Sequence, residues 1–468
     1  MINDTFLKVF EHYEPLKFHN DPTDITVPEN FLLTTEMVSQ TLSSLNSKKS
    51  CGPEPIPIVI LKELSSLLAL PLTHIFNSAL IEGYFPAQWK RADVCPVAKK
   101  SRVQDPEKDL RPISLTSPVG KVYERHLNSL LLQQVGASLD ERHFGSVKGS
   151  STTCALVDLM NFLLSSTDDP NDIVRLCFYD LSKGFDRVDH NILFDILCQF
   201  DVHPALVQSN ASFLTGRSQR VCFDGISSEW KPVVAGIPQG SVLGPTLFLL
   251  MVNSLAHRER WCWKYMDDIT VGETLRADAD IVSSLQESSN DICREVHERR
   301  MQLNPIKCKE MLICFKWKTP IITNITIDNS SIERVSSYKL LGLIISSNLK
   351  WNAQIEFLTK KASKRIYSVR LLKRASVAEQ DLVTFYITCI RSVLEYACPA
   401  WFYSTPSYLL EQLESIQRRT MRVIYPDHSY HDACLQARVP RVKERLEDLC
   451  KSFFASMQNQ QQTSWTFP

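Results

Sequence analysis

Two adjacent carboxylates, Asp267 and Asp268, stand in the middle of the segment WCWKYMDDITVGE. Aromatic and β-branched residues flank the pair on both sides, which predicts a β-hairpin with the acids at its tip. Neighbouring carboxylates repel each other unless a cation offsets their charge. Mg²⁺ suits such a place, because it binds carboxylate and phosphate oxygens. The alternative is an ordinary turn in which Asp bonds its own backbone.

A third acid lies far upstream, where Asp180 ends the apolar run DIVRLCFYDL. If this strand neighbours the hairpin, three carboxylates converge at one point. Such a cluster forms the protein half of a two-metal site for phosphoryl or nucleotidyl transfer. The alternative for Asp180 is a strand-end acid that caps the following helix. Asp186 and Asp189 suit that capping role better, so they are left out of the predicted metal set.

Composition sets broad limits on the protein class. The chain has 468 residues, of which 44% are hydrophobic and 22% charged, which is typical of a soluble protein with two or three lobes. The net charge is zero, but residues 350–426 contain 12 Lys and Arg against 6 Asp and Glu. A basic lobe beside an acidic site indicates binding of a charged polymer, although solvated surface charge explains each residue individually.

Cysteine usage and the chain start predict the compartment. The 14 cysteines are scattered with no CxxC pair, as in reduced intracellular proteins. The N-terminus lacks a signal-peptide pattern, and no apolar run is long enough to cross a bilayer. We therefore expect an intracellular protein that is neither secreted nor membrane-bound.

The order of the predicted elements indicates an α+β fold. Strand-like and helical segments alternate up to about residue 346, whereas the pattern from Asn352 onward is helical only. Between residues 352 and 374 the apolar residues fall on one helix face and the lysines largely off it.

Seven segments, taken in order, resemble those of reverse transcriptases from non-LTR (LINE-type, jockey-like) retrotransposons. They are RPISLTSPVGKVYE, HFGSVKGSSTTCAL, FYDLSKGFDRVDH, AGIPQGSVLGPTLF, YMDD, LNPIKCKEMLICF and YKLLGLIISSNLKW. The resemblance covers roughly residues 50–445. It implies a right-hand polymerase that has fingers, a palm with an antiparallel sheet and helices, and a helical thumb. It also implies extension of a DNA primer on an RNA template with deoxynucleoside triphosphates.

The resemblance implies a division of the chain. The expected parts are an N-terminal linker region (1–50), fingers (51–175), a palm (176–346), a helical thumb (347–445) and a C-terminal tail (446–468). The reverse transcriptase domain itself is expected at about 85–346, which includes part of the fingers.

The same resemblance assigns the metal site. Asp180 and Asp267 match the acids that hold two Mg²⁺ ions, for which Mn²⁺ can substitute. Asp268 matches the second acid of the pair, and the backbone carbonyl of Leu181 is a further candidate ligand. Phe185 matches the position whose ring excludes a 2′-hydroxyl, although a buried core aromatic is the alternative from the sequence alone.

Other matches concern the nucleotide and the template–primer. Gln239 and Gly240 are expected beside the nucleotide. Arg111 and either Lys99 or Lys100 match cations that hold the triphosphate, and Lys307 or Lys309 is a candidate partner of pyrophosphate. Exposed basic turns and a plain tight turn are the alternatives. Contacts with template and primer are expected from Lys148, Lys360, Lys364, Tyr265 and Met266.

The chain also departs from the family pattern. The loop that usually reads FGFRKG is FGSVKG here, so Ser146 and Val147 replace an aromatic residue and an Arg. Gly184 stands where Ala is usual. We expect the endonuclease function of such elements to be supplied elsewhere or lost. The resemblance implies work in the nucleus or the cytoplasm. The alternative is a catalytically decayed or domesticated protein of this fold that binds RNA or a template–primer.

Overall fold

The computed structural model describes residues 2–18, 25–54, 56–276, 283–316 and 321–461. These residues form a mixed α+β fold, as the sequence predicted. Its centre is a five-stranded sheet with strand order β12-β9-β3-β8-β7, in which β3 pairs antiparallel with both β8 and β9. The strands are β3 (Asp172–Asp180), β7 (Trp261–Tyr265), β8 (Asp268–Arg276), β9 (Lys309–Ile313) and β12 (Glu333–Arg334).

The central sheet is buried on both faces, and each face belongs to a different hydrophobic core. Side chains alternate along β3, so that Cys177 and Tyr179 enter one core while Leu176 and Phe178 enter the other. The first core includes side chains from α8 (His190–Gln199), α10 (Gly244–Val252) and α11 (Leu285–Glu298). The second is built with α7 (Thr152–Ser165) and the C-terminal helices.

A second sheet has the order β2-β1-β4-β5, with β6 also paired to β4. Its strands are β1 (Arg91–Ala98), β2 (Leu110–Thr116), β4 (Arg217–Phe223), β5 (Ile226–Ser227) and β6 (Lys231–Val233). Four further short strands form two hairpins, β10 (Thr326–Ile327) with β11 (Ser330–Ser331) and β13 (Ser337–Leu340) with β14 (Leu343–Ser346).

The N-terminal region is more structured than a linker. Helix α1 (Ile2–Leu7) packs on the second sheet, where Phe6 joins Val94 and Val221 in a small core. Asn3 adds hydrogen bonds to Ser228 and Gln219. Burial of Phe6 explains why this segment is held against the sheet.

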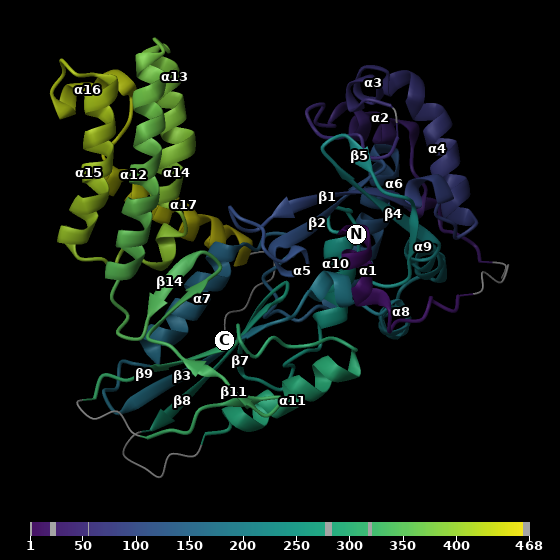
Figure 1. The fold of residues 1–468 in the computed structure, drawn as a ribbon, viewed down its shortest axis with the longest axis horizontal. Coiled ribbons are helices and arrows are strands. Elements are labelled where there is room, and N and C mark those ends of the chain that lie inside the picture. Colours follow the sequence, from purple (N-terminus) through teal and green to yellow (C-terminus); the bar gives the residue numbers. More distant parts are fainter. Residues whose placement is uncertain (1, 19–24, 55, 277–282, 317–320, 462–468) are drawn as a thin grey trace.

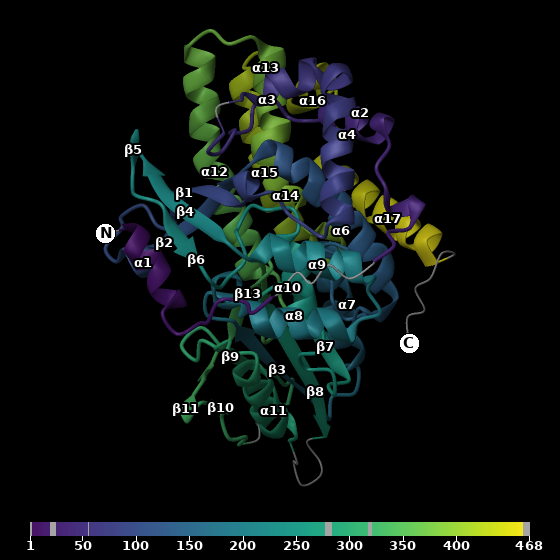
Figure 2. The same cartoon turned by 90° about the vertical axis from the view of Figure 1, so that its right-hand side faces the viewer.

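Two helical groups rise on opposite sides above the central sheet (Figure 1), and after the 90° turn both groups still stand above it (Figure 2). One group contains α2 (Thr35–Ser43), α3 (Ile58–Glu63) and α4 (Ser65–Ile81), and below it lie α6 (Pro118–Val135) and α9 (Pro204–Leu214). The short α5 (Pro106–Asp109) connects β1 to β2.

The other group is the C-terminal part of the chain. It comprises α12 (Asn352–Arg374), α13 (Glu379–Phe385), a π-helical turn (Tyr386–Arg391), α14 (Ser392–Glu395), α15 (Ser407–Ile424), α16 (Tyr430–Ala437) and α17 (Val442–Gln461). The tail expected from residue 446 thus begins inside α17, because Leu446 and Cys450 are buried in the second core. Residues 462–468 lie outside the described residues. Among the described helices, none has the length and apolarity to cross a bilayer.

Candidate active site

The three predicted acids lie at one end of the central sheet. Asp180 and Asp268 are directly opposite each other in the antiparallel β3–β8 pair, and Tyr265 is opposite Asp268 across the β7–β8 hairpin. Met266 and Asp267 therefore form the two-residue tip of that hairpin. Directly opposite residues have Cβ atoms about 4.5–5.5 Å apart. The remote aspartate and the doublet are neighbours, as the sequence predicted.

A loop that precedes α7 supports the hairpin tip. The Phe144 N–H donates to the Lys264 carbonyl at 2.8 Å, and the Lys264 N–H donates to the Arg142 carbonyl at 2.9 Å. Met266 has φ 56°, a left-handed conformation that two-residue hairpin turns require. A Cβ on Gly145 would lie 2.8 Å from the Met266 nitrogen, so the loop needs glycine there. Lys148, farther along the loop, is exposed.

Burial and mutual repulsion raise the pKa values of the Asp267–Asp268 doublet. Burial, together with the charges of Asp267 and Asp180, raises the pKa of Asp268 to about 7. Burial also raises the pKa of Asp267, with the charge of Asp180 adding to the shift. The Nζ atom of Lys307 lies 3.0 and 3.2 Å from the two carboxylate oxygens of Asp180.

The donor set fits Mg²⁺ in its chemistry, because three carboxylates and the Leu181 carbonyl are hard oxygen ligands. A cation would also relieve the repulsion that raises the pKa values of the doublet. In the described part of the chain, however, no three His, Cys, Asp or Glu side chains are arranged to hold a metal. The Lys307 ammonium group forms an ion pair with the Asp180 carboxylate.

Phe185 lies on a short 3₁₀ helix, η5 (Gly184–Arg187), whose first residue approaches the acids, since a Cβ on Gly184 would lie 3.5 Å from the Asp267 Cβ. Its ring is partly buried and stacks on Phe248, with the ring centroids 4.4 Å apart and the planes at 9°. Two backbone bonds tie this segment to the loop at 236–240. Ile237 N–H donates to the Phe185 carbonyl at 2.8 Å, and Gly236 N–H donates to the Val188 carbonyl at 2.7 Å.

The 236–240 loop also contacts the second sheet. The Ser114 N–H of β2 donates to the Gln239 carbonyl at 2.8 Å. Gly240 has φ 127°, and a Cβ there would lie 2.6 Å from the Ser114 carbonyl oxygen. Glycine is therefore required by both conformation and space. The loop joins the two sheets at the acid site.

Several cations surround the site. Burial lowers the pKa of Lys99, and the charges of Arg111 and Lys307 lower it further. The charges of Lys307 and Arg111 also act on Asp267, where they oppose the rise in its pKa. Lys307 and Arg111 thus act electrostatically on Asp267, whereas Lys99 acts on Asp186.

The residues expected to contact template and primer are more dispersed. Lys360 and Lys364 are exposed on α12, outside the acid site, and Lys360 forms an ion pair with Glu356. Tyr265 ends β7, and burial raises the pKa of its phenol. The predicted face of α12 is confirmed, since Ile355, Leu358 and their neighbours at helical spacing are buried.

The prediction that Asp186 caps the helix after β3 was wrong. Asp189 caps α8, accepting from the Asn191 N–H at 2.8 Å. Asp186 does not cap that helix. Its Oδ1 accepts instead from Nε2 of Gln239 at 2.9 Å. No local pattern links GFDR to AGIPQG, because the two segments meet only in the folded chain.

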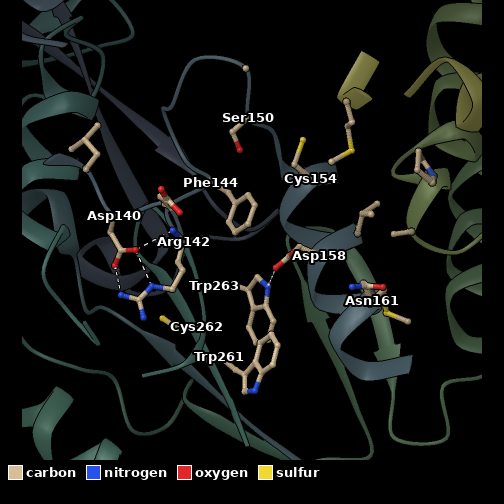
Figure 3. Close-up of a pocket in the computed structure, with 18 of the residues that line it drawn as sticks. Asp140, Arg142, Phe144, Ser150, Cys154, Asp158, Asn161, Trp261, Cys262 and Trp263 are labelled. Atoms are coloured by element: carbon tan, nitrogen blue, oxygen red, sulfur yellow. Dashed lines mark hydrogen bonds and ion pairs between the residues drawn. The ribbon is translucent and has the colours of Figure 1, made fainter. Parts of the chain in front are cut away.

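A cavity of about 1120 Å³ lies on another side of the hairpin, between α7, β7, residues 399–404 and α17. Figure 3 shows Trp263 of β7 beside Asp158 of α7, whose carboxylate accepts from Trp263 Nε1 at 2.6 Å, with Trp261 next to Trp263. The three acids are not among its lining residues. The predicted chemistry therefore lies outside this cavity.

The chain matches a known protein family and several curated proteins. Residues 97–358 match the family model described as reverse transcriptase (RNA-dependent DNA polymerase). The chain is 27% identical over 438 residues to an RNA-directed DNA polymerase from mobile element jockey of Drosophila funebris. The alignment covers 90% of the chain and 47% of that relative. The RNA-directed DNA polymerase from mobile element jockey of Drosophila melanogaster is 26% identical to the chain. That alignment covers 93% of the chain and 49% of the relative.

A probable RNA-directed DNA polymerase from transposon BS of Drosophila melanogaster is 25% identical and covers 90% of the chain and 47% of that relative. The chain thus spans about half the length of these curated relatives. The family model covers more than half of the chain and includes all three acids. The chain therefore belongs to the reverse transcriptase (RNA-dependent DNA polymerase) family, and within it to the LINE type.

Proposed function

We propose that the protein is an RNA-directed DNA polymerase that extends a DNA primer on an RNA template by nucleotidyl transfer. The observation that carries the proposal is the register that places Asp180 opposite Asp268, with Asp267 at the adjoining hairpin tip. Three acids that feel the positive charges of Lys307 and Arg111 suit a reaction in which metal-bound phosphate changes partners.

The architecture is assigned to a right hand in this proposal. The central sheet, with α8, α10 and α11, is the palm. It takes most of residues 176–346, whereas β4, β5 and β6 within that range belong to the second sheet. The second sheet and the helices above it are the fingers, and the helices from α12 to α16 are the thumb. Figure 1 shows the two helical groups on opposite sides above the central sheet, and the proposal assigns the template–primer to the space between fingers and thumb.

In this proposal Asp180 and Asp267 hold two Mg²⁺ ions, for which Mn²⁺ can substitute, with Asp268 and the Leu181 carbonyl in support. When bound, the ions lower the pKa of the primer 3′-hydroxyl and stabilise the leaving pyrophosphate. Lys99 and Arg111 hold the triphosphate, with Arg offering two parallel donors to one phosphate. Lys307 leaves Asp180 and neutralises the departing pyrophosphate.

The exposed cations and the hairpin tip serve the polymer. Lys360 and Lys364 on α12 attract backbone phosphates without regard to sequence. Lys148, Tyr265 and Met266 are placed along the supporting loop and the tip, where template and primer would meet. The natural setting we propose is intracellular, in the nucleus or the cytoplasm.

Metal-dependent primer extension tests this function. Purified protein with poly(rA)/oligo(dT) should incorporate dTTP in the presence of Mg²⁺. EDTA should stop incorporation, and added Mg²⁺ should restore it, because the acids alone cannot stabilise the charge that develops on phosphate. The second candidate function is template–primer binding without synthesis, which Lys307 on Asp180 and the FGSVKG loop favour. Retention of the substrate with no extension at any Mg²⁺ or Mn²⁺ concentration would support that candidate instead.

Phe185 provides a test of sugar selection. A rigid ring below the sugar would clash with a 2′-hydroxyl, the group that distinguishes ribose from deoxyribose. Phe185→Val should therefore raise rUTP incorporation relative to dTTP by about tenfold or more, since a lost steric clash is worth at least about 1.4 kcal/mol. Single-nucleotide extension with each substrate measures the ratio. Phe248→Leu, which removes the stacked partner but keeps the ring of Phe185, should change it less.

A further inference from the structure

Lys264 lies in β7, three residues before Asp267, and its side chain is completely buried. Its Nζ atom lies 2.6 Å from Oδ2 of Asp140. The same ammonium group donates to the carbonyl of Asn253 at 2.6 Å and to that of Leu255 at 3.0 Å. An ammonium group has three N–H donors, so each of them has an acceptor here. The position of this ammonium group is therefore fixed from three directions.

Two of the three acceptors lie at the C-terminal end of α10. Asn253 is the C-cap residue of that helix, and Leu255 follows two positions later. The last carbonyls of a helix lack partners within it, and the helix dipole places negative charge at this end. A buried cation satisfies both requirements. Because α10 begins at Gly244, shortly after the 236–240 loop, Lys264 connects β7 to the helix that follows that loop.

The third acceptor, Asp140, comes from the loop before α7. Its Oδ1 accepts from the backbone N–H of Arg142 at 3.0 Å and from Nε of Arg142 at 2.8 Å, and Figure 3 shows the two side chains together. The Asp140 N–H donates to Oδ1 of Asn253 at 2.8 Å. Burial by itself would raise the pKa of Asp140, but hydrogen bonds from Arg142 and the charge of Lys264 hold that pKa well below its usual range. The carboxylate is therefore charged and held by two cations.

The backbone of Lys264 is held by the same loop, since its N–H and its carbonyl bond to Arg142 and Phe144. Two residues separate Lys264 from Asp267 at the hairpin tip, and the tip itself is only partly buried. The contacts that fix Lys264 therefore fix the end of the strand from which the tip projects.

A contribution to stability alone explains this arrangement less well. A buried ion pair adds little net stability, because the cost of removing two charges from water offsets their attraction. The three acceptors instead give the ammonium group one defined place between a helix end, a loop and a strand. Metal ligands are commonly oriented by hydrogen-bonded residues behind them, and the buried side chain lies directly behind the acid hairpin.

We propose that Lys264 is a positioning residue for Asp267, and that Asp140 orients it. By joining β7 to the end of α10 and to the loop before α7, Lys264 keeps the hairpin tip where Asp267 and Asp180 share bound ions. This inference rests on the proposed function and its metal site, and it adds to them the group that holds the tip in place.

Lys264→Met tests this role, because it keeps an unbranched side chain but removes the ammonium group. Asp140 retains Arg142 as its ion-pair partner in this variant. The Kd for Mn²⁺, measured by electron paramagnetic resonance on protein without nucleotide, should rise about tenfold, as is common when a residue behind a metal ligand is changed. In primer extension on poly(rA)/oligo(dT), the Mg²⁺ concentration that gives half the maximal rate should rise by a similar factor, whereas the KM for dTTP should change little.

Two further variants separate positioning from stability. Arg391→Met makes the same kind of change at a buried cation that pairs with Glu395 in the C-terminal helices, so it should lower the melting temperature without changing the Kd for Mn²⁺. Asp140→Asn should raise that Kd less than Lys264→Met does, because two carbonyls still hold the ammonium group. In the double variant, Asp140→Asn should add little to Lys264→Met, as expected for residues that act through one contact.

An unchanged Kd for Mn²⁺ and an unchanged Mg²⁺ dependence in folded Lys264→Met protein would overturn the assignment. An equal loss of metal affinity in Arg391→Met would also overturn it, because the effect would then follow stability alone. If wild-type protein binds Mn²⁺ through Asp267 but does not extend the primer, the proposed function fails, and the Kd of Lys264→Met still decides the role of Lys264. If Asp267→Ala changes neither Mn²⁺ binding nor extension, the metal site fails, and this assignment fails with it.

Discussion

Replacing Asp267 by Ala should lower dTTP incorporation at least about a thousandfold, close to complete loss. Asp267 is at the hairpin tip beside the Asp180–Asp268 pair, so no neighbouring carboxylate can take its position. Charge stabilisation by metal ions in a transfer reaction is worth several kcal/mol, and each 1.36 kcal/mol is a factor of ten in rate. Primer extension under single-turnover conditions with saturating dTTP measures the chemical step directly.

Two comparisons make the Asp267 result specific. Asp427→Ala removes an exposed acid from a loop of the C-terminal helices and should leave the rate unchanged. Asp268→Ala should reduce the rate less than Asp267→Ala, because its ligation is proposed to be indirect. Equal melting temperatures for all three variants would exclude unfolding as the cause. Incorporation that persists after Asp267→Ala would contradict the assignment of the metal site.

The largest expected effect on stability comes from a buried ion pair in the central sheet. Arg175 of β3 and Glu310 of β9 are 3% and 0% exposed, and Arg175 Nε lies 2.7 Å from Glu310 Oε1. Arg334 also contacts that carboxylate at 2.9 Å. Glu310→Leu removes the nearer acidic partner of buried Arg175 and leaves, among the described residues, only Glu273, at 3.8 Å. The free energy of unfolding should fall by about 3–5 kcal/mol, measured by denaturant titration.

The double variant Arg175→Met/Glu310→Leu distinguishes charge burial from lost packing. Removing both charges should cost less than removing Glu310 alone, because replacing a buried pair by apolar residues is often near neutral. A double variant that is as unstable as the sum of its single variants would show that packing dominates. Since the acids lie at the end of the same sheet, the variants should be tested for extension at a temperature where each is folded.

The sequence was sufficient for features that depend on local pattern. Alternation along β3 and around the doublet predicted two strands, and the polar tip predicted the turn, so the meeting of Asp180 and Asp268 needed only that the strands be adjacent. The buried face of α12 follows from helical spacing in the same way. These elements are specified by periodicity, which a single chain displays.

Features that depend on contacts between distant segments were not predictable. Asp186 was interpreted as a helix cap, because capping is the common local use of Asp, and its partner Gln239 is 53 positions away. The packing of Gly145 against Met266 was missed for the same reason. Lys307 was expected near phosphate, yet without a ligand it neutralises Asp180. In each case long-range geometry selected one of several local options.

The central sheet separates two hydrophobic cores, and this has a consequence for substitutions far from the acids. Because β3 is a common wall of two cores, the nucleotide segments pack on one side of it and the C-terminal helices on the other. A substitution that disrupts packing deep in those helices should therefore distort the strand that ends in Asp180, without changing any proposed metal ligand. Loss of polymerase activity would then arise from packing defects far from the acids as well as from loss of the acids themselves.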